Sequence, residues 1–273
     1  MEEAKSHTTL STQSYWDEVL AAAALPRINT PRAYHHRITM EYIDKYFSSN
    51  KYSTLLEIGC GSSGWLPYFA KRYHLKVSGL DYSDVGCRLA EENLKMLNIE
   101  FGEIICKDLL APECTGGKKY DVVFSYGVIE HFEEPEKIVR IFNSLLNEGG
   151  MIITLVPNLN GFMGWISQYF VPAIFKIHKV MSAADLKRYH EAIGLKNLKT
   201  GYAGTFTLDV VPLVKSERFK WTNRWSKFGF ALINKSNRLI TKLISMLKIN
   251  LPSRQFSPYI IAIATKTNET AGE

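Results

Sequence analysis

A glycine-rich loop with a carboxylate just in front of it is the part of this chain that most directly suggests a chemistry. Residues 54–64 read TLLEIGCGSSG, so Glu57 stands two positions before Gly59, and Gly61 and Gly64 complete the spacing Gly-x-Gly-x-x-Gly. Such glycines let a backbone approach its ligand closely, and in dinucleotide-binding proteins that ligand is a pyrophosphate. A carboxylate would repel a pyrophosphate but attract a cation. We therefore expect Glu57 to face a cationic ligand.

Two further acidic residues stand where parallel strands are expected to end. A strand over 76–80 ends at Asp81, whose carboxylate would accept hydrogen bonds from both hydroxyls of a ribose. A strand over 103–107 ends at Asp108, which is well placed for the edge of an adenine. NAD enzymes also recognise a ribose, so Asp81 does not distinguish the two cofactors. The distinction rests on Glu57. S-adenosylmethionine carries cationic sulfonium and amino groups and no phosphate, and we expect it rather than NAD.

Five short motifs follow one another over about residues 50–160. They read LLEIGCGSSG, GLDYS, CKDLL, DVVFSYGVIEHF and LLNEGGMIITLVPN. In these motifs the chain resembles the class I S-adenosylmethionine-dependent methyltransferases, with a weaker continuation to residue 204. The resemblance implies S-adenosylmethionine as cofactor and a set of cofactor-binding residues, namely Glu57, Gly59, Gly61, Gly64, Asp81, Tyr82, Asp108, Leu109 and Ser125.

Ordinary structural roles also exist for these residues. The glycines would serve a tight turn with positive φ, Asp81 would cap a helix that begins near Asp84, and Asp108 would be a turn residue. Separate turn and cap roles are a poorer explanation for the whole set, because these residues follow three strands in the order that the cofactor would require.

Alternating strand and helix signals predict an α/β fold, a doubly wound, Rossmann-like sheet of seven strands. Beyond the strands above, we expect strands over 120–125, 150–156 and 196–204, and helices over 65–73, 84–98, 135–147 and 182–193. The resemblance implies that the last strand is antiparallel. The expected organisation is an N-terminal helical cap (1–50, with helices at 15–20 and 31–37), a cofactor-binding core (51–204), an insertion (205–256), a final core strand (257–266) and a polar tail (267–273).

Composition agrees with a cytoplasmic enzyme. The 273 residues are 46% hydrophobic, enough to bury a large core. Four cysteines, Cys60, Cys87, Cys106 and Cys114, show no metal-ligand spacing and are expected to be reduced thiols. The first residues lack the pattern of a signal peptide, and no apolar run reaches the roughly 20 residues of a membrane-spanning helix.

The insertion holds the positive charge of the chain. Residues 215–254 contain ten Lys and Arg against one acid, Glu217, whereas the chain as a whole carries +6. Within it, residues 231–249 alternate apolar and basic positions at helical spacing, after an aromatic stretch with Trp221, Trp225 and Phe228. This pattern is typical of a helix on an anionic membrane surface. It fits equally a helix that packs its apolar face on the domain. Nucleic-acid binding is not expected, because no recognised module accompanies the charge.

A second apolar stretch, over 161–175, follows the fifth strand. The resemblance places this region over the substrate. Its aromatic residues suggest an apolar substrate wall or a lid that touches a membrane, and a helix buried in the core is the alternative.

His131 is the leading candidate for a catalytic base, with Glu130 beside it, because both follow the fourth strand at the ligand-binding edge of the sheet. His178, His190 and Tyr126 are other candidates. The segment is similar to ubiquinone-pathway O-methyltransferases, in which a Glu-x-x-Glu-His pattern holds a divalent cation. Here Gly127 replaces the first carboxylate, so no metal is expected.

These observations predict an S-adenosylmethionine-dependent methyltransferase that acts on a small or lipid-like acceptor, at oxygen rather than nitrogen or carbon. Peripheral attachment to a membrane through 215–254 is part of this prediction. A tRNA or protein methyltransferase is the alternative enzyme, recognisable by salt-sensitive binding of a macromolecule. A non-catalytic relative that only binds a ligand is the alternative outside the enzymes.

Overall fold

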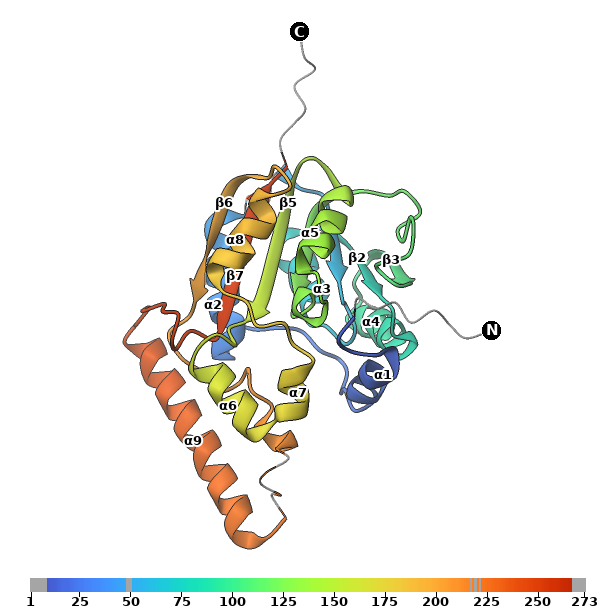
Figure 1. The fold of residues 1–273 in the computed structure, drawn as a ribbon. Coiled ribbons are helices and arrows are strands. Elements are labelled where there is room, and N and C mark those ends of the chain that lie inside the picture. The colour runs from blue at the N-terminus through green and yellow to red at the C-terminus, as the bar shows by residue number, and fades with distance from the viewer. Residues whose placement is uncertain (1–8, 48–50, 217, 219, 221, 267–273) are drawn as a thin grey trace.

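The structure, a computed structural model, describes residues 9–47, 51–216, 218, 220 and 222–266. A seven-stranded sheet forms its centre, in the order β3-β2-β1-β4-β5-β7-β6 (Figure 1). Strand β7 runs antiparallel between β5 and β6, and the other strands run parallel to one another. The predicted fold class is confirmed. The strands are β1 (Thr54–Ile58), β2 (Lys76–Asp81), β3 (Phe101–Cys106), β4 (Tyr120–Tyr126), β5 (Leu146–Pro157), β6 (Lys196–Ala203) and β7 (Tyr259–Thr265).

Helices cover both faces of this sheet. One face packs against α2, α3 and α4, and the other against α5 and α8. Neighbouring strand residues explain why: Leu55 faces the first helical layer and Leu56 the second, so both sides of β1 must be apolar. The helices are α1 (Gln13–Ala21), α2 (Tyr34–Tyr46), α3 (Trp65–Tyr73), α4 (Asp84–Met96), α5 (Pro135–Ser144), α6 (Phe162–Phe170), α7 (Pro172–Lys176), α8 (Ala183–Glu191) and α9 (Arg224–Met246), with short 3₁₀ turns η2 (Ile129–His131) and η3 (Leu213–Lys215).

The largest differences from the predicted element boundaries lie at β5 with α5 and at α2. Strand β5 begins at Leu146 rather than near residue 150, and α5 ends at Ser144, because the fully buried Leu146 pairs with Tyr120 of β4 across an irregularity in the strand register. Helix α2 begins at Tyr34, later than expected, and extends to Tyr46 because Ile38 and Ile43 bury against the sheet.

A third apolar cluster lies beyond the carboxyl edge of the sheet. It joins Met163 and Ile166 of α6 to Val211, with Ile233 of α9 partly buried against it. We call α6, α7 and the described part of 205–256 the lobe; Figure 1 shows it below the sheet, with α9 projecting farthest. Among the described residues no helix combines the length and the apolar composition needed to span a bilayer. The four cysteines are free thiols, as predicted. The polar tail 267–273, Glu217 and Trp221 lie outside the described residues.

Candidate active site

A cavity of about 500 Å³ opens at the carboxyl edge of the parallel strands. Its wall is formed by the residues that follow β1, β2, β3 and β4 and by the N-terminal cap. Ten of the eleven predicted site residues line it, namely Glu57, Gly59, Gly61, Gly64, Asp81, Tyr82, Asp108, Leu109, Glu130 and His131. Ser125 is completely buried near the end of β4 and is not among the lining residues.

Two glycines of the loop, Gly59 and Gly64, are required for different reasons. Gly59 has φ of +70°, and a Cβ there would lie 2.7 Å from Cγ2 of Val128. Gly64 has φ of −93°, so no unusual backbone conformation requires it. A Cβ on Gly64 would instead lie 2.6 Å from Oδ1 of Asn29, which belongs to the N-terminal cap. The loop is therefore shaped both by its turn and by the close approach of the cap.

Glu57 is a buried carboxyl group with one free oxygen. Its Oε1 accepts a hydrogen bond of 2.7 Å from Oγ of Ser63, and Oε2 has no partner among the described residues. Burial raises the pKa of Glu57 to about 8. A buried acid with an unused oxygen in a cavity wall is suited to a cationic ligand, which would restore its ionised form.

Asp81 is oriented by the backbone around it. Its Oδ2 accepts from the amide of Gly61 at 2.8 Å and its Oδ1 from the amide of Ser83 at 2.9 Å. Burial raises the pKa of this carboxyl above its usual range. The cap of α4 is Ser83, whose hydroxyl accepts from the amide of Gly86, so Asp81 is not the helix cap that the alternative interpretation required.

Two further residues complete this side of the cavity. Asp108 is exposed, and its Oδ1 accepts from the amide of Leu110, so it acts in a turn and also lines the cavity. Burial raises the pKa of the Tyr82 hydroxyl to about 12, so it remains a hydrogen-bond donor at neutral pH.

On the acceptor side, Glu130, His131 and His178 form a cluster in which one donor atom of each lies within 4.8 Å of the others. Nδ1 of His131 lies 2.8 Å from the carbonyl oxygen of Ile177, and Nδ1 of His178 lies 2.6 Å from that of Ile174. A carbonyl can only accept, so we assign the proton of each neutral ring to Nδ1 and leave Nε2 as a free acceptor. Oε2 of Glu130 is buried without a partner among the described residues.

Burial sets the charge of this cluster. It lowers the pKa of His131 to about 3, an effect that the neighbouring His178 increases, and it also lowers the pKa of His178. It raises the pKa of Glu130 to about 8. At neutral pH both rings are therefore uncharged and Glu130 is largely protonated. Once ionised, Glu130 is the stronger proton acceptor of the two catalytic candidates.

The donor atoms of this cluster determine which metal ion it could bind. Gly127, which stands where ubiquinone-type enzymes have a carboxylate, has φ of +72°, a conformation that a side chain would strain. The donors present are one carboxylate and two imidazoles, with His178 added to the pair named from sequence. This set does not fit a hard cation such as Mg²⁺, and it fits a transition-metal ion better.

The N-terminal cap closes the cavity over this cluster. The ring of Trp16 meets that of His131 edge to face, with centroids 5.0 Å apart, and its Nε1 donates to Oγ of Ser11. The amide of Leu10 donates to the carbonyl of His131 at 2.7 Å. Trp16 and Leu10 therefore hold the N-terminal segment against His131 at this side of the cavity.

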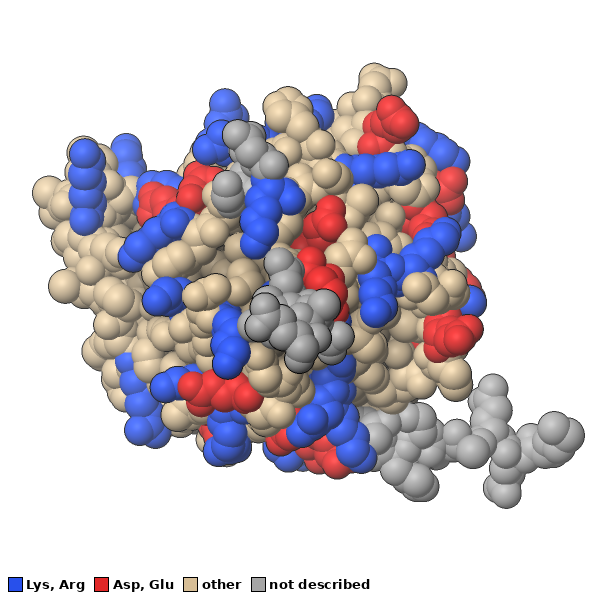
Figure 2. Space-filling view, turned by 90° about the horizontal axis from the view of Figure 1, so that it is seen from above, with Lys and Arg blue, Asp and Glu red and all other residues tan. Residues whose placement is uncertain are grey.

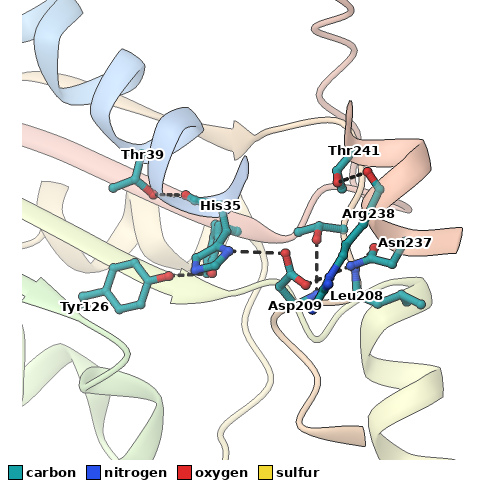
Figure 3. Close-up of polar contacts among 10 residues, drawn as sticks. His35, Thr39, Tyr126, Leu208, Asp209, Asn237, Arg238 and Thr241 are labelled. Atoms are coloured by element: carbon teal, nitrogen blue, oxygen red, sulfur yellow. Dashed lines mark hydrogen bonds and ion pairs between the residues drawn. The ribbon is translucent and has the colours of Figure 1, made fainter. Parts of the chain in front are cut away.

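The opposite wall carries a polar pair that sequence analysis did not single out (Figure 3). Nδ1 of His35 lies 3.3 Å from Oδ2 of Asp209. Nδ2 of Asn237 on α9 donates to Oδ1 of Asp209 at 2.8 Å, while its Oδ1 accepts from the amide of Leu208. The hydroxyl of Tyr126 donates to that of Tyr259 nearby. These residues come from distant parts of the chain, so no local motif could have revealed them.

A second cavity of about 290 Å³ adjoins the first one. Residues that border both cavities are Trp16, Pro157, His178, Asp209 and Val210. Ile174 and Phe175 give the second cavity an apolar wall, and Lys215 borders it as well. His190 borders neither cavity; it is fully buried and hydrogen-bonds Thr154, so it is no longer a candidate base.

Comparison with known proteins agrees with this geometry. A family model described as a methyltransferase domain matches residues 18–200. The chain is 28% identical over 149 residues to the ubiquinone biosynthesis O-methyltransferase of Acinetobacter baylyi, covering 54% of this chain and 58% of that protein. It is 30% identical over 107 residues to the enzyme of the same name from Glaesserella parasuis, covering 38% and 45%. The chain thus matches less than two thirds of the length of these curated relatives.

Solved structures share the fold at low sequence identity. A SAM-dependent methyltransferase from Archaeoglobus fulgidus superposes with a TM-score of 0.53 at 18% identity, over 94% of this chain and 100% of that one. Phosphoethanolamine N-methyltransferase 2 from Haemonchus contortus, in complex with S-adenosylmethionine, gives 0.54 at 13% identity, over 94% and 58%. The chain belongs to the methyltransferase-domain family.

Proposed function

We propose that this protein is an S-adenosylmethionine-dependent methyltransferase that methylates an oxygen atom of a small, lipid-like acceptor, with Glu130 receiving the proton and His131 beside it as a hydrogen-bond acceptor. The observation that supports this most is the cluster of Glu130, His131 and His178, which brings one ligand atom of each residue within 4.8 Å of the others in the same cavity as Glu57 and Asp81. A hydroxyl loses its proton when its oxygen is methylated, so such a reaction needs an acceptor of this kind. The relatives from Acinetobacter and Glaesserella are O-methyltransferases by name.

When bound, S-adenosylmethionine supplies a methyl group already activated by a sulfonium. The carboxylates of Glu57 and Asp81 would hold the cationic and ribose parts of the donor, and Asp108 with Leu109 would border its adenine. The ionised form of Glu130 would receive the proton of the acceptor hydroxyl, and the Nε2 of His131 would accept a hydrogen bond from the protonated carboxyl that results. The Trp16 ring, packed edge to face against His131, would limit the access of water to the reacting groups.

The apolar second cavity supports the lipid-like character of the acceptor. Ile174 and Phe175 would contact its apolar part while its hydroxyl lies near His178, which borders both cavities. An acceptor of this kind partitions into lipid, so peripheral association with an anionic membrane belongs to the same proposal.

A labelling experiment tests this function. The purified enzyme is incubated with methyl-labelled S-adenosylmethionine and a total lipid and small-molecule extract of the source cells. We expect label in an organic-soluble product, with the methyl group on oxygen by mass spectrometry, and its loss in a Glu130→Gln/His131→Asn variant that still binds the donor. Label in precipitated tRNA or protein instead would contradict the proposal and support the macromolecular alternative.

A further inference from the structure

Helix α9 presents three distinct faces around its axis. At about 1.5 Å per residue its 23 residues form a rod of about 35 Å. The face that packs on the molecule is partly polar: its buried residues are Asn237, Thr241 and Ile244. Asn237 anchors it to Asp209, as Figure 3 shows. The apolar residues of α9 therefore do not all face the domain, contrary to the packed-helix interpretation of the sequence.

A second face is an exposed apolar stripe. Its members are spaced three, four or seven residues apart, so at about 100° per residue they share one side of the helix. Each is between 47% and 81% exposed, and the stripe consists of Trp225, Phe228, Leu232, Leu239, Leu243 and Met246. Soluble proteins rarely leave a continuous apolar strip of this length in water without a partner.

The third face, beside the stripe, is basic. Its residues are exposed and consist of Arg224, Lys227, Lys235, Arg238 and Lys242, and the sequence of α9 contains no acidic residue. The opposite end of the molecule differs. Figure 2 looks down on the amino edge of the sheet and shows basic and acidic side chains mixed over that surface. The positive charge is concentrated at the same end as the cavity.

We propose that the lobe docks on an anionic membrane, with α9 lying in the plane of the interface, the apolar stripe inserted and the basic face against lipid phosphates. This proposal rests on the proposed function, since it names where the acceptor is met. An anionic bilayer offers negative charge and an apolar interior within a few ångströms of each other, and it therefore matches both faces at once. Nucleic acid would match only the basic face. A second copy of this chain, paired through the stripe, would bring two basic faces together.

A neighbouring helix adds interfacial aromatic residues to the lobe. Trp165 of α6 is 62% exposed, and Tyr169 stacks against it with Arg218 4.5 Å above the Tyr169 ring. Aromatic rings and arginines of this kind favour the boundary between headgroups and acyl chains. Since Phe175 of the adjacent α7 borders the second cavity, an acceptor leaving the bilayer would meet that cavity first.

Vesicle flotation with the full chain tests this docking. The vesicles consist of phosphatidylcholine, alone or mixed with phosphatidylglycerol, at low and high salt. We expect wild type to float with the anionic vesicles at low salt and to be released by high salt. Because each basic residue contributes a comparable increment at an anionic surface, Lys235→Gln/Arg238→Gln/Lys242→Gln should weaken partition about a hundredfold. The matched control Lys76→Gln/Lys119→Gln/Lys196→Gln removes the same charge from the amino edge and should retain binding.

A second variant separates a membrane from other partners. Leu239→Gln/Leu243→Gln/Met246→Gln alters only exposed stripe residues, and we expect about a tenfold loss of vesicle binding. The control Met96→Gln, at another exposed apolar side chain, should behave as wild type. Calorimetry with S-adenosylmethionine on each variant shows that the core is folded and keeps this test separate from the identity of the acceptor.

Three results would overturn the docking proposal. One is absence of wild type from anionic vesicles at low salt. Another is a loss of vesicle binding in the amino-edge control that is as large as the loss in the α9 variant Lys235→Gln/Arg238→Gln/Lys242→Gln. The third is another partner: capture of bulk tRNA without vesicle binding, or a dimer in sedimentation that the stripe variant dissociates.

Discussion

The two sides of the cavity are constructed in different ways. On the donor side, each acidic side chain accepts at least one hydrogen bond from a residue near it in sequence: Glu57 from the hydroxyl of Ser63, Asp81 from the amide of Ser83 and Asp108 from the amide of Leu110. On the acceptor side, the partners are far apart in sequence, as with His35 and Asp209 or His131 and Ile177. A site made from local segments can be recognised as a motif, whereas a site made by tertiary packing depends on the whole fold. Substitutions on the two sides should therefore fail in different ways.

The largest effect is expected at His131. His131→Asn should lower turnover about 10²-fold while S-adenosylmethionine affinity stays within about twofold, because the ring serves the acceptor and not the donor. Steady-state kinetics with an acceptor found by the labelling experiment, beside donor calorimetry, measures both. His190→Asn is the matched control, a buried histidine outside both cavities. Joint loss of stability and donor binding would make His131 a loop anchor through its bond to Ile177.

An effect of comparable size is expected at Asp81, but on donor affinity rather than on turnover. Asp81→Ala should weaken donor binding by about 1.5–3 kcal/mol, because a charged hydrogen-bond acceptor for the ribose is lost. Calorimetry measures it, and Asp84→Ala, at the start of α4 and outside the cavity lining, is the control. Unchanged affinity in folded Asp81→Ala would leave this residue with a purely structural role in the loop.

A smaller effect is expected at Asn237, which connects α9 to the acceptor wall. Asn237→Leu should lower the free energy of unfolding by about 1–3 kcal/mol, because Asp209 loses a hydrogen-bond donor and the amide of Leu208 loses its acceptor. Chemical denaturation measures this, with the exposed Ser236→Ala as control. Donor affinity should not change. A weaker donor affinity in Asn237→Leu would show that the two sides are coupled.

The smallest effect is expected from metal removal. Treatment with a chelator should leave turnover nearly unchanged, because Gly127 interrupts the carboxylate pattern that holds a hard cation. Activity with and without the chelator is the measurement. Strong inhibition reversed by Zn²⁺ or Mn²⁺, and abolished in His178→Asn, would instead make Glu130, His131 and His178 a metal site.

The sequence predicted the donor side well, because that side is made from local segments that can be recognised as motifs. All seven strands were located, and the residues after β1, β2 and β3 line the cavity as expected. Ser125 does not line the cavity in this structure, because alternation along a buried strand does not show which face opens into a cavity. His178 was named only as a base, because its place beside Glu130 depends on how α7 packs. The pattern of α9 showed that it is amphipathic but did not show which of three faces is buried.

The most direct test concerns Glu57, whose pKa of about 8 means that the free protein holds a proton there at pH 7. A bound cation favours the carboxylate, so donor binding should release that proton and should tighten as pH rises toward 8. Calorimetry of S-adenosylmethionine binding at pH 7, in two buffers of different ionisation enthalpy, counts released protons. We predict about one proton fewer from Glu57→Gln than from wild type, with no binding of NAD to either. Equal proton release from both proteins would contradict a cationic donor held by this buried acid.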